Sequence, residues 1–201
     1  MTIPHSLLDH SPAFGLFLHA SAVAVNGGAI LFLGHSTAGK STIARLTGTA
    51  HSVLADDSVF VSPGGDGAWR VVDGSFRFGR DEVPDFQNKI RRRAAGEGAV
   101  PLRGCFRIHK AAATRIEPLA PIDLARYLMD AVMEVDLQRK GLGVQDSTQS
   151  LRELHRGILE SRKAWFSQVA AIARSVRGWH LWFPLDLGIQ QWNRLLVETL
   201  S

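Results

Sequence analysis

The sequence contains a single cysteine and no long uninterrupted apolar run, and each absence excludes a class of protein. Cys105 has no partner for an internal disulfide, so we expect it to be core filler in a protein of the reducing cytoplasm. The longest apolar stretch, Ala20 to Leu33, is broken by Asn26-Gly27-Gly28 and falls short of the ~20 residues that a membrane helix needs. The first residues also lack the basic and apolar segments of a secretory signal. We therefore expect a soluble, cytoplasmic protein without a membrane partner.

Internal repeats, low-complexity tracts and a large charge excess are absent as well. A chain of 201 residues suits one domain, and we expect residues 1–201 to form it. The net charge of +4 is small and is compatible with a bound nucleotide. The densest basic cluster, Lys89 to Arg93, has no interleaved aromatic residues that could stack on bases. We interpret it as a solvated surface and expect no nucleic-acid partner.

The order of β-formers, turn residues and apolar periods predicts strands followed by helices. Residues 17–25 are expected to form one strand, joined by a tight hairpin at Asn26-Gly27-Gly28 to a strand over 29–33 that is buried on both faces. A helix over 41–46 and a buried strand over 53–55 should follow. Later strands are expected over 58–62, 69–72, 75–78, 100–108, 114–119 and 179–185, and helices over 121–137, 151–176 and 189–200.

A glycine-rich motif connects the second strand to the first helix. Its sequence, Gly34-His35-Ser36-Thr37-Ala38-Gly39-Lys40-Ser41, matches Gly-x-x-x-x-Gly-Lys-Ser/Thr. Glycines let the backbone approach an anion, and successive N–H groups at the start of a helix point at its phosphates. Lys40 suits the β and γ phosphates, and the Ser41 hydroxyl suits Mg²⁺. The motif, extended to Thr42, predicts a site for ATP and Mg²⁺, whereas the alternative is a chance glycine turn.

Two neighbouring carboxylates end the strand that follows the first helix. Asp56 and Asp57 come after an interval from Lys40 that suits a helix, a turn and a returning strand. We therefore expect them beside the loop, where one would hold the hydration shell of Mg²⁺ and the other would accept a proton from an attacking hydroxyl. The alternative is that the Asp-Asp pair merely forms a turn.

His19 precedes the loop, and taken alone it is an ordinary core or surface residue. Together, however, the segment His-Ala-Ser-Ala-Val, the glycine turn, the apolar strand, the loop and the strand ending Ala-Asp-Asp resemble the catalytic core of the HPr kinase/phosphorylase family. The resemblance is close over His19 to Val61 and loose elsewhere. It is shared by stand-alone members of a broader HPr-kinase-like group, such as the kinases of lasso-peptide precursors.

The resemblance implies roles for individual residues. It implies that residues 34–41 bind ATP and that His19, Lys40 and one of the two aspartates serve catalysis, with Asp57 favoured as base and Asp56 as metal partner. Leu102-Arg103-Gly104 is similar to the family's Glu-x-Arg-Gly segment, which implies a catalytic role for Arg103.

Three positions depart from the family pattern. Thr37 replaces a glycine of the family's loop, Thr42 replaces a glutamate, and Pro101 stands where the family has a metal-binding glutamate. No counterpart of the family's basic substrate-capture loop is found in the sequence. The resemblance therefore implies membership of the broader HPr-kinase-like group more than activity on HPr itself.

These observations predict an α/β fold with a P-loop nucleotide-binding core of the HPr kinase and phosphoenolpyruvate carboxykinase kind, a mixed β-sheet and C-terminal helices. The expected function is an ATP-dependent kinase acting on a hydroxyl, a serine of a small protein or peptide. One alternative is a regulator that binds a nucleotide without transferring phosphate, and another is a small-molecule kinase. The sequence leaves the acceptor, the pathway and the oligomeric state open.

Overall fold

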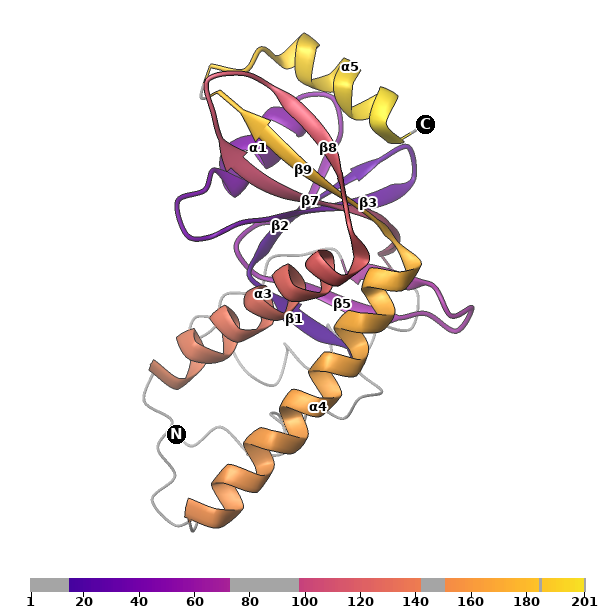
Figure 1. The fold of residues 1–201 in the computed structure, drawn as a ribbon. Coiled ribbons are helices and arrows are strands. Elements are labelled where there is room, and N and C mark those ends of the chain that lie inside the picture. The colour runs from indigo at the N-terminus through magenta and orange to yellow at the C-terminus, as the bar shows by residue number, and fades with distance from the viewer. Residues whose placement is uncertain (1–14, 73–97, 142–150, 185, 201) are drawn as a thin grey trace.

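A computed structural model describes residues 15–72, 98–141, 151–184 and 186–200 of the chain. The strand predicted over 75–78 and the basic cluster of Lys89 to Arg93 lie outside the described residues. Within them the chain forms a mixed β-sheet with four helices packed against it (Figure 1). The predicted α/β class, with a mixed sheet and C-terminal helices, is confirmed.

The sheet is built around three parallel strands, β3, β7 and β9, and antiparallel strands extend it on either side. Its order is β1-β5-β6-β7-β3-β2-β4, with β9 joined to β7 and β8 joined to β9. The strands span Leu16–Leu18 (β1), Ala20–Val25 (β2), Gly28–Leu33 (β3), Ser52–Ala55 (β4), Val59–Pro63 (β5), Trp69–Val72 (β6), Ala99–Lys110 (β7), Arg115–Leu119 (β8) and Arg177–Phe183 (β9).

β7 is long enough to serve two parts of the sheet. Residues 99–101 pair with β6, residues 104–110 pair with β9, and β3 occupies the opposite edge of β7. Because β3 and β7 are parallel, their carboxyl ends meet at the same border of the sheet. Leu33, the last residue of β3, is paired there with Arg107.

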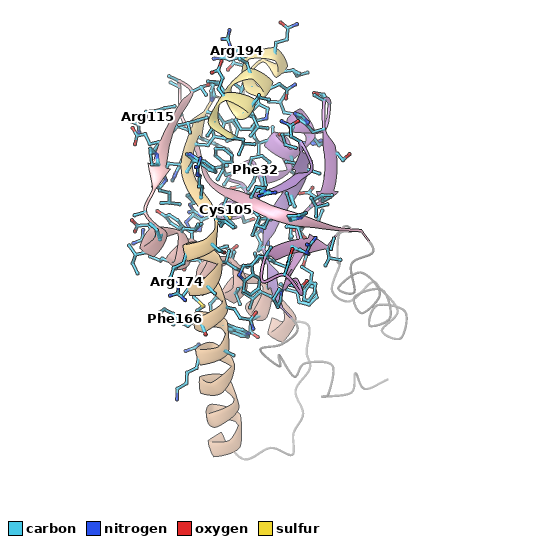
Figure 2. All side chains as sticks on the ribbon, turned by 90° about the vertical axis from the view of Figure 1, so that its right-hand side faces the viewer. Phe32, Cys105, Arg115, Phe166, Arg174 and Arg194 are labelled. Carbon is cyan, nitrogen blue, oxygen red and sulfur yellow. The ribbon has the colours of Figure 1, made fainter. Side chains whose placement is uncertain are left out.

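The helices cover both faces of the sheet. α1 (Lys40–Thr47) and α5 (Ile189–Leu200) lie on one face, whereas α3 (Pro121–Gly141) and α4 (Leu151–Ser175) lie on the other (Figure 1). Figure 2 shows Phe32 and Cys105 in the interior, and the two side chains belong to the cores on opposite faces. No helix of the described segments is long and apolar enough to cross a membrane.

The hairpin between β2 and β3 is confirmed, because Asn26 and Gly27 have the positive φ angles, 49° and 76°, that a type I′ turn requires. The single strand predicted over 17–25 is wrong, since the chain divides at His19 into β1 and β2, which pair with different strands. The His19 N–H donates instead to the carbonyl of Ala131 on α3, at 3.0 Å. This bond ties the break in the strand to α3.

Cys105 lies in the apolar core between the sheet and α3, as the sequence indicates. It is fully buried, and burial raises the pKa of its thiol to about 12. A thiol with this pKa stays protonated at neutral pH and is a poor nucleophile. The prediction that Cys105 is core filler is confirmed.

Candidate active site

The loop of residues 34–39 leaves the end of β3 and enters α1, as its sequence predicts. Lys40 is buried at the base of the loop, where its Nζ donates to the carbonyl oxygens of Gly34 (2.8 Å) and His35 (3.1 Å). Only glycine fits at position 34, because a Cβ there would lie 2.8 Å from the Ala38 Cβ and 2.9 Å from the Ile108 Cγ1. The lysine thus holds the loop closed around its own ammonium group.

Two residues of the loop have left-handed backbone conformations. Gly39 has a φ of 102° and Thr37 a φ of 67°. Glycine adopts such angles freely, but a β-branched residue at positive φ costs of order 1–3 kcal/mol. A glycine at position 37 would adopt this backbone conformation without strain. The loop of this protein therefore carries backbone strain at Thr37.

Asp56 joins the loop to β2. Its Oδ1 accepts hydrogen bonds from the Ser21 Oγ (2.5 Å), the Ser41 Oγ (3.0 Å) and the Asp57 N–H (3.1 Å). Ser41 and Thr42 are exposed on the first turn of α1. The predicted metal partners, Ser41 and Asp56, are thus brought within hydrogen-bonding distance of each other.

His19 lies between Asp57 and α3. Its ring is buried, with Nδ1 3.8 Å from the Asp57 Oδ1. This separation exceeds the ~3.2 Å limit of a good N–H···O bond, and catalytic contacts are often long until a substrate binds. Asp57 has a positive φ of 74° and its side chain is 66% exposed, so its carboxylate stands at the opening of the site.

Glu134 of α3 completes this group, and the sequence reasoning missed it. Its Oε2 lies 3.9 Å from the His19 Nε2, and its Oε1 lies 3.9 Å from the Nδ1 of His35 in the loop. The sequence alone does not distinguish Glu134 from other carboxylates on a helix surface, because only the packing of α3 against β1 brings it to the loop. Glu134 therefore links α3 to both His19 and the loop.

The buried side chains of the site titrate away from their ordinary values. Burial, followed by the nearby Lys40 ammonium, lowers the pKa of His19, although Glu134 and Asp57 act in the opposite direction. Burial also lowers the pKa of Lys40, and the Arg107 guanidinium acts in the same direction, although Glu134 and Asp57 oppose it. Both effects disfavour additional positive charge. His19 is accordingly neutral at pH 7.

Arg107 is a second buried cation at this border of the sheet. It belongs to β7, opposite the last residue of β3, and is only 6% exposed. Its guanidinium carbon lies 4.5 Å from the centre of the Tyr127 ring on α3. The sequence reasoning missed Arg107 too, although a charge within the apolar run of residues 104–108 is a signal that could have found it.

Arg103 lies elsewhere. It is exposed on β7 and its stem covers Gly28, the first residue of β3, so the length of β3 separates it from the loop. Pro101 lies still closer to the start of β7 and pairs with Arg70 of β6. The structure therefore gathers His19, the loop, Asp56 and Asp57, but not Arg103.

The residues present fit Mg²⁺ held together with phosphate. Across the described segments, no group of three histidine, cysteine or carboxylate side chains surrounds a common point where a metal could bind. Mg²⁺ needs no such cage, because it is commonly bound through one or two carboxylates, substrate phosphates and water. The Ser41 hydroxyl and the Asp56 carboxylate are oxygen ligands of the required kind.

Comparison with known proteins gives a family. Residues 7–181 match the model of a family described as SynChlorMet cassette protein ScmC. The chain belongs to the ScmC family. The matched region contains every residue of the site described above, and the family description states no activity. No curated protein matches the sequence.

A solved structure, the HPr(Ser) kinase/phosphatase from Coxiella burnetii, is similar to this ScmC family member over 92% of each chain. The sequence identity is 12% and the TM-score is 0.36. A likeness at this level carries no argument about function. One HPr-kinase-like domain over residues 1–201 therefore stays a prediction.

Proposed function

We propose that this ScmC family member is an ATP-dependent kinase that phosphorylates a hydroxyl, and that its acceptor is a serine of a small protein or peptide. One observation carries the proposal. The loop with its buried Lys40, the Ser41–Asp56 contact and the His19–Asp57 pair converge at the carboxyl ends of β3 and β4. Phosphate binding, metal binding and proton acceptance thus have candidate groups within one site.

In the proposed complex, residues 34–41 hold the phosphates of ATP. The backbone N–H groups at the start of α1 and the Lys40 ammonium face the phosphate oxygens, and the positive end of the helix dipole adds to their effect. Ser41 and Asp56 hold Mg²⁺. When bound, Mg²⁺ supplies positive charge to the phosphate oxygens.

The proposed transfer needs one base. The acceptor oxygen forms a bond to the γ-phosphorus, the bond between that phosphorus and the β,γ-bridging oxygen breaks, and ADP leaves. The hydroxyl proton passes to the Asp57 carboxylate, which is exposed and can meet a hydroxyl carried by a larger molecule. This exposure supports a protein or peptide acceptor over a small metabolite.

His19 is proposed to position Asp57. A neutral imidazole has one N–H, yet its two nitrogens face Asp57 and Glu134. Only one of the two carboxylates can receive that N–H at a time. We assign the Nδ1–H to Asp57, which fixes the carboxylate at the opening of the site.

Phosphoryl transfer to peptides tests the proposal. The protein is incubated with γ-labelled ATP, Mg²⁺ and a library of serine-containing peptides, beside Lys40→Ala and the matched surface variant Lys163→Ala, whose lysine is exposed on α4. The wild type and Lys163→Ala should label a peptide, and Lys40→Ala should not. HPr is included as an acceptor and should stay unlabelled, because the sequence offers no capture loop for it.

The outcomes separate the alternatives. A regulator would bind ATP in a direct binding assay but label nothing, either in the library or in a cell extract. A small-molecule kinase would label only the low-molecular-mass fraction of the extract. Either result would overturn the proposal of a peptide or protein acceptor.

A further inference from the structure

Arg107 is a buried charge with no ion-pair partner among the described residues. No carboxylate of the described residues lies within ion-pair distance of its guanidinium, and its Nε is buried with no hydrogen-bond partner among them. Two acidic side chains of α3, Asp130 and Glu134, act on Arg107 electrostatically without forming an ion pair with it. Its described contact is the face of the Tyr127 ring.

Such an arrangement is costly in a protein without a ligand. Taking the Nε–H of a guanidinium out of water is unfavourable unless an anion or another hydrogen-bond acceptor replaces the water. The cation–π contact with Tyr127 offsets only part of this cost. By contrast, two exposed arginines of neighbouring elements have carboxylate partners, Arg115 with Glu117 (3.2 Å) and Arg126 with Asp123 (3.4 Å). The contrast indicates that Arg107 is free to bind an anion supplied from outside the described residues.

The position of Arg107 identifies that anion. Arg107 stands opposite the residue that precedes the loop, and its charge reaches Lys40, the other buried cation of the site. We propose that Arg107 binds the terminal phosphate of the nucleotide and shares it with Lys40. This inference rests on the proposed function, because it assigns a further residue to the same site.

The terminal phosphate is favoured over the inner ones for a geometric reason. The inner phosphates of a nucleotide in such a loop are surrounded by backbone N–H groups, and the lysine reaches the outer ones. Arg107 comes from a neighbouring strand, on the face of the sheet covered by α3, where Glu134 and His19 also lie. It therefore approaches from the side of the proposed base, where the transferred phosphoryl group must lie.

Binding of ATP and ADP to Arg107 variants tests the inference. Arg107→Met keeps an apolar stem of similar size, Arg107→Lys keeps the charge, and Arg177→Met changes an exposed arginine on the neighbouring strand β9 as a matched control. Calorimetry with Mg-ATP and Mg-ADP gives both affinities, and thermal unfolding without nucleotide reports the fold.

We expect Arg107→Met to bind ATP roughly 10- to 100-fold more weakly than the wild type, as the loss of a hydrogen bond to a charged group predicts, with ADP affinity within about threefold. Arg107→Lys should recover part of the loss, and Arg177→Met should match the wild type. Without nucleotide, Arg107→Met should unfold at the same or a higher temperature than the wild type, because an unpaired buried charge has been removed.

Each contrary outcome has a distinct meaning. If the wild type binds ATP and Arg107→Met keeps the same ATP-to-ADP affinity ratio, Arg107 does not contact the terminal phosphate. If Arg107→Met and Arg107→Lys both unfold at clearly lower temperatures, Arg107 is a structural residue and the inference is wrong. If the wild type binds no ATP, the proposed function itself fails.

Discussion

The two faces of the sheet differ in what they bury, and neighbouring residues of β7 show the difference. Phe106 points toward α1 and α5, where its ring centre lies 6.0 Å from Phe32 and 6.1 Å from Trp192. Arg107 points toward α3 and has no ion pair among the described residues. The face covered by α1 and α5 is packed with apolar side chains around Phe106. The face covered by α3 instead buries a charged side chain, Arg107, beside the loop. Stability and chemistry should therefore respond to different mutations.

The largest effect is expected from the proposed base on the α3 side. Asp57→Asn keeps the shape of the side chain but removes its capacity to accept a proton, so turnover should fall by roughly 10²–10⁴-fold. ATP affinity should change little, because Asp57 is assigned to the acceptor and not to the nucleotide. Steady-state phosphorylation and calorimetry measure the two effects.

Asp186→Asn, which changes an exposed aspartate far along the chain near α5, is the matched control for this variant. It should leave turnover and affinity at wild-type values. If Asp57→Asn retains turnover within about threefold, the Asp-Asp pair is a structural turn and the role given to Asp57 is wrong.

On the opposite face, Trp192→Ala should mainly cost stability. Trp192 is fully buried and its Nε1–H donates to the Thr47 Oγ1 of α1 at 2.8 Å. Removing a buried tryptophan costs about 3–5 kcal/mol in the free energy of unfolding. Denaturant unfolding should show this loss, while ATP affinity of the remaining folded protein stays near that of the wild type. A large loss of ATP affinity in the folded variant would show that packing on the α1 and α5 face also controls nucleotide binding.

The low pKa of His19 predicts a dependence of stability on pH. Between the lowered pKa of folded His19 and its unfolded value near 6.5, the unfolded chain binds more protons. The contribution of His19 to stability is therefore complete above about pH 6.5 and is lost as the pH falls through its folded pKa. Melting temperatures between pH 7 and pH 5 should fall more steeply for the wild type than for His19→Gln.

The comparison with His19→Gln is needed because His109 and His180 also have pKa values lowered by burial. They stay unchanged in the variant, so the difference between the two curves isolates His19. Parallel curves would mean that His19 is not protonated in this range of pH or is protonated equally in both states.

The smallest effect is expected in the loop. Thr37→Gly removes the Cβ from a residue with a φ of 67°, but glycine also gains freedom in the unfolded chain. The net gain in the free energy of unfolding should be about 0.5–1 kcal/mol, measured by denaturant titration. A loss of stability would show that the Thr37 side chain makes a stabilising contact that outweighs the strain.

Local patterns in the sequence were sufficient for most of the fold. Asn26-Gly27 predicted a hairpin through its preference for positive φ, and the apolar run over 29–33 predicted a strand that is fully buried. The break at His19 was not predictable, because it depends on a backbone hydrogen bond to Ala131 of a distant helix. The sharing of β7 between β6 and β9 likewise depends on pairing between distant segments.

The residues of the candidate site also fall into those that local sequence predicts and those that depend on contacts between distant segments. The loop and Asp56 could be placed from a motif and a chain interval, since both follow from the order of one strand, one helix and the next strand. Glu134 could not be assigned to the site, because its neighbours His19 and His35 are far away in the sequence. The charge of Arg107 within an apolar run is a signal in the sequence, but only the pairing of β7 with β3 places it beside the loop. Arg103 shows the converse, since a short similar segment implied a role at a position that the fold separates from the loop.

Calorimetric titration of Mg-ATP tests the central claim most directly, because every other role assigned to the α3 side of the loop presupposes nucleotide binding. The wild type and Lys163→Ala should bind ATP with equal affinity. Lys40→Ala, with its fold verified by circular dichroism, should bind at least roughly 10- to 100-fold more weakly, since it loses the charged hydrogen bonds to phosphate. Equal affinity in Lys40→Ala, or no binding by the wild type, would contradict the account.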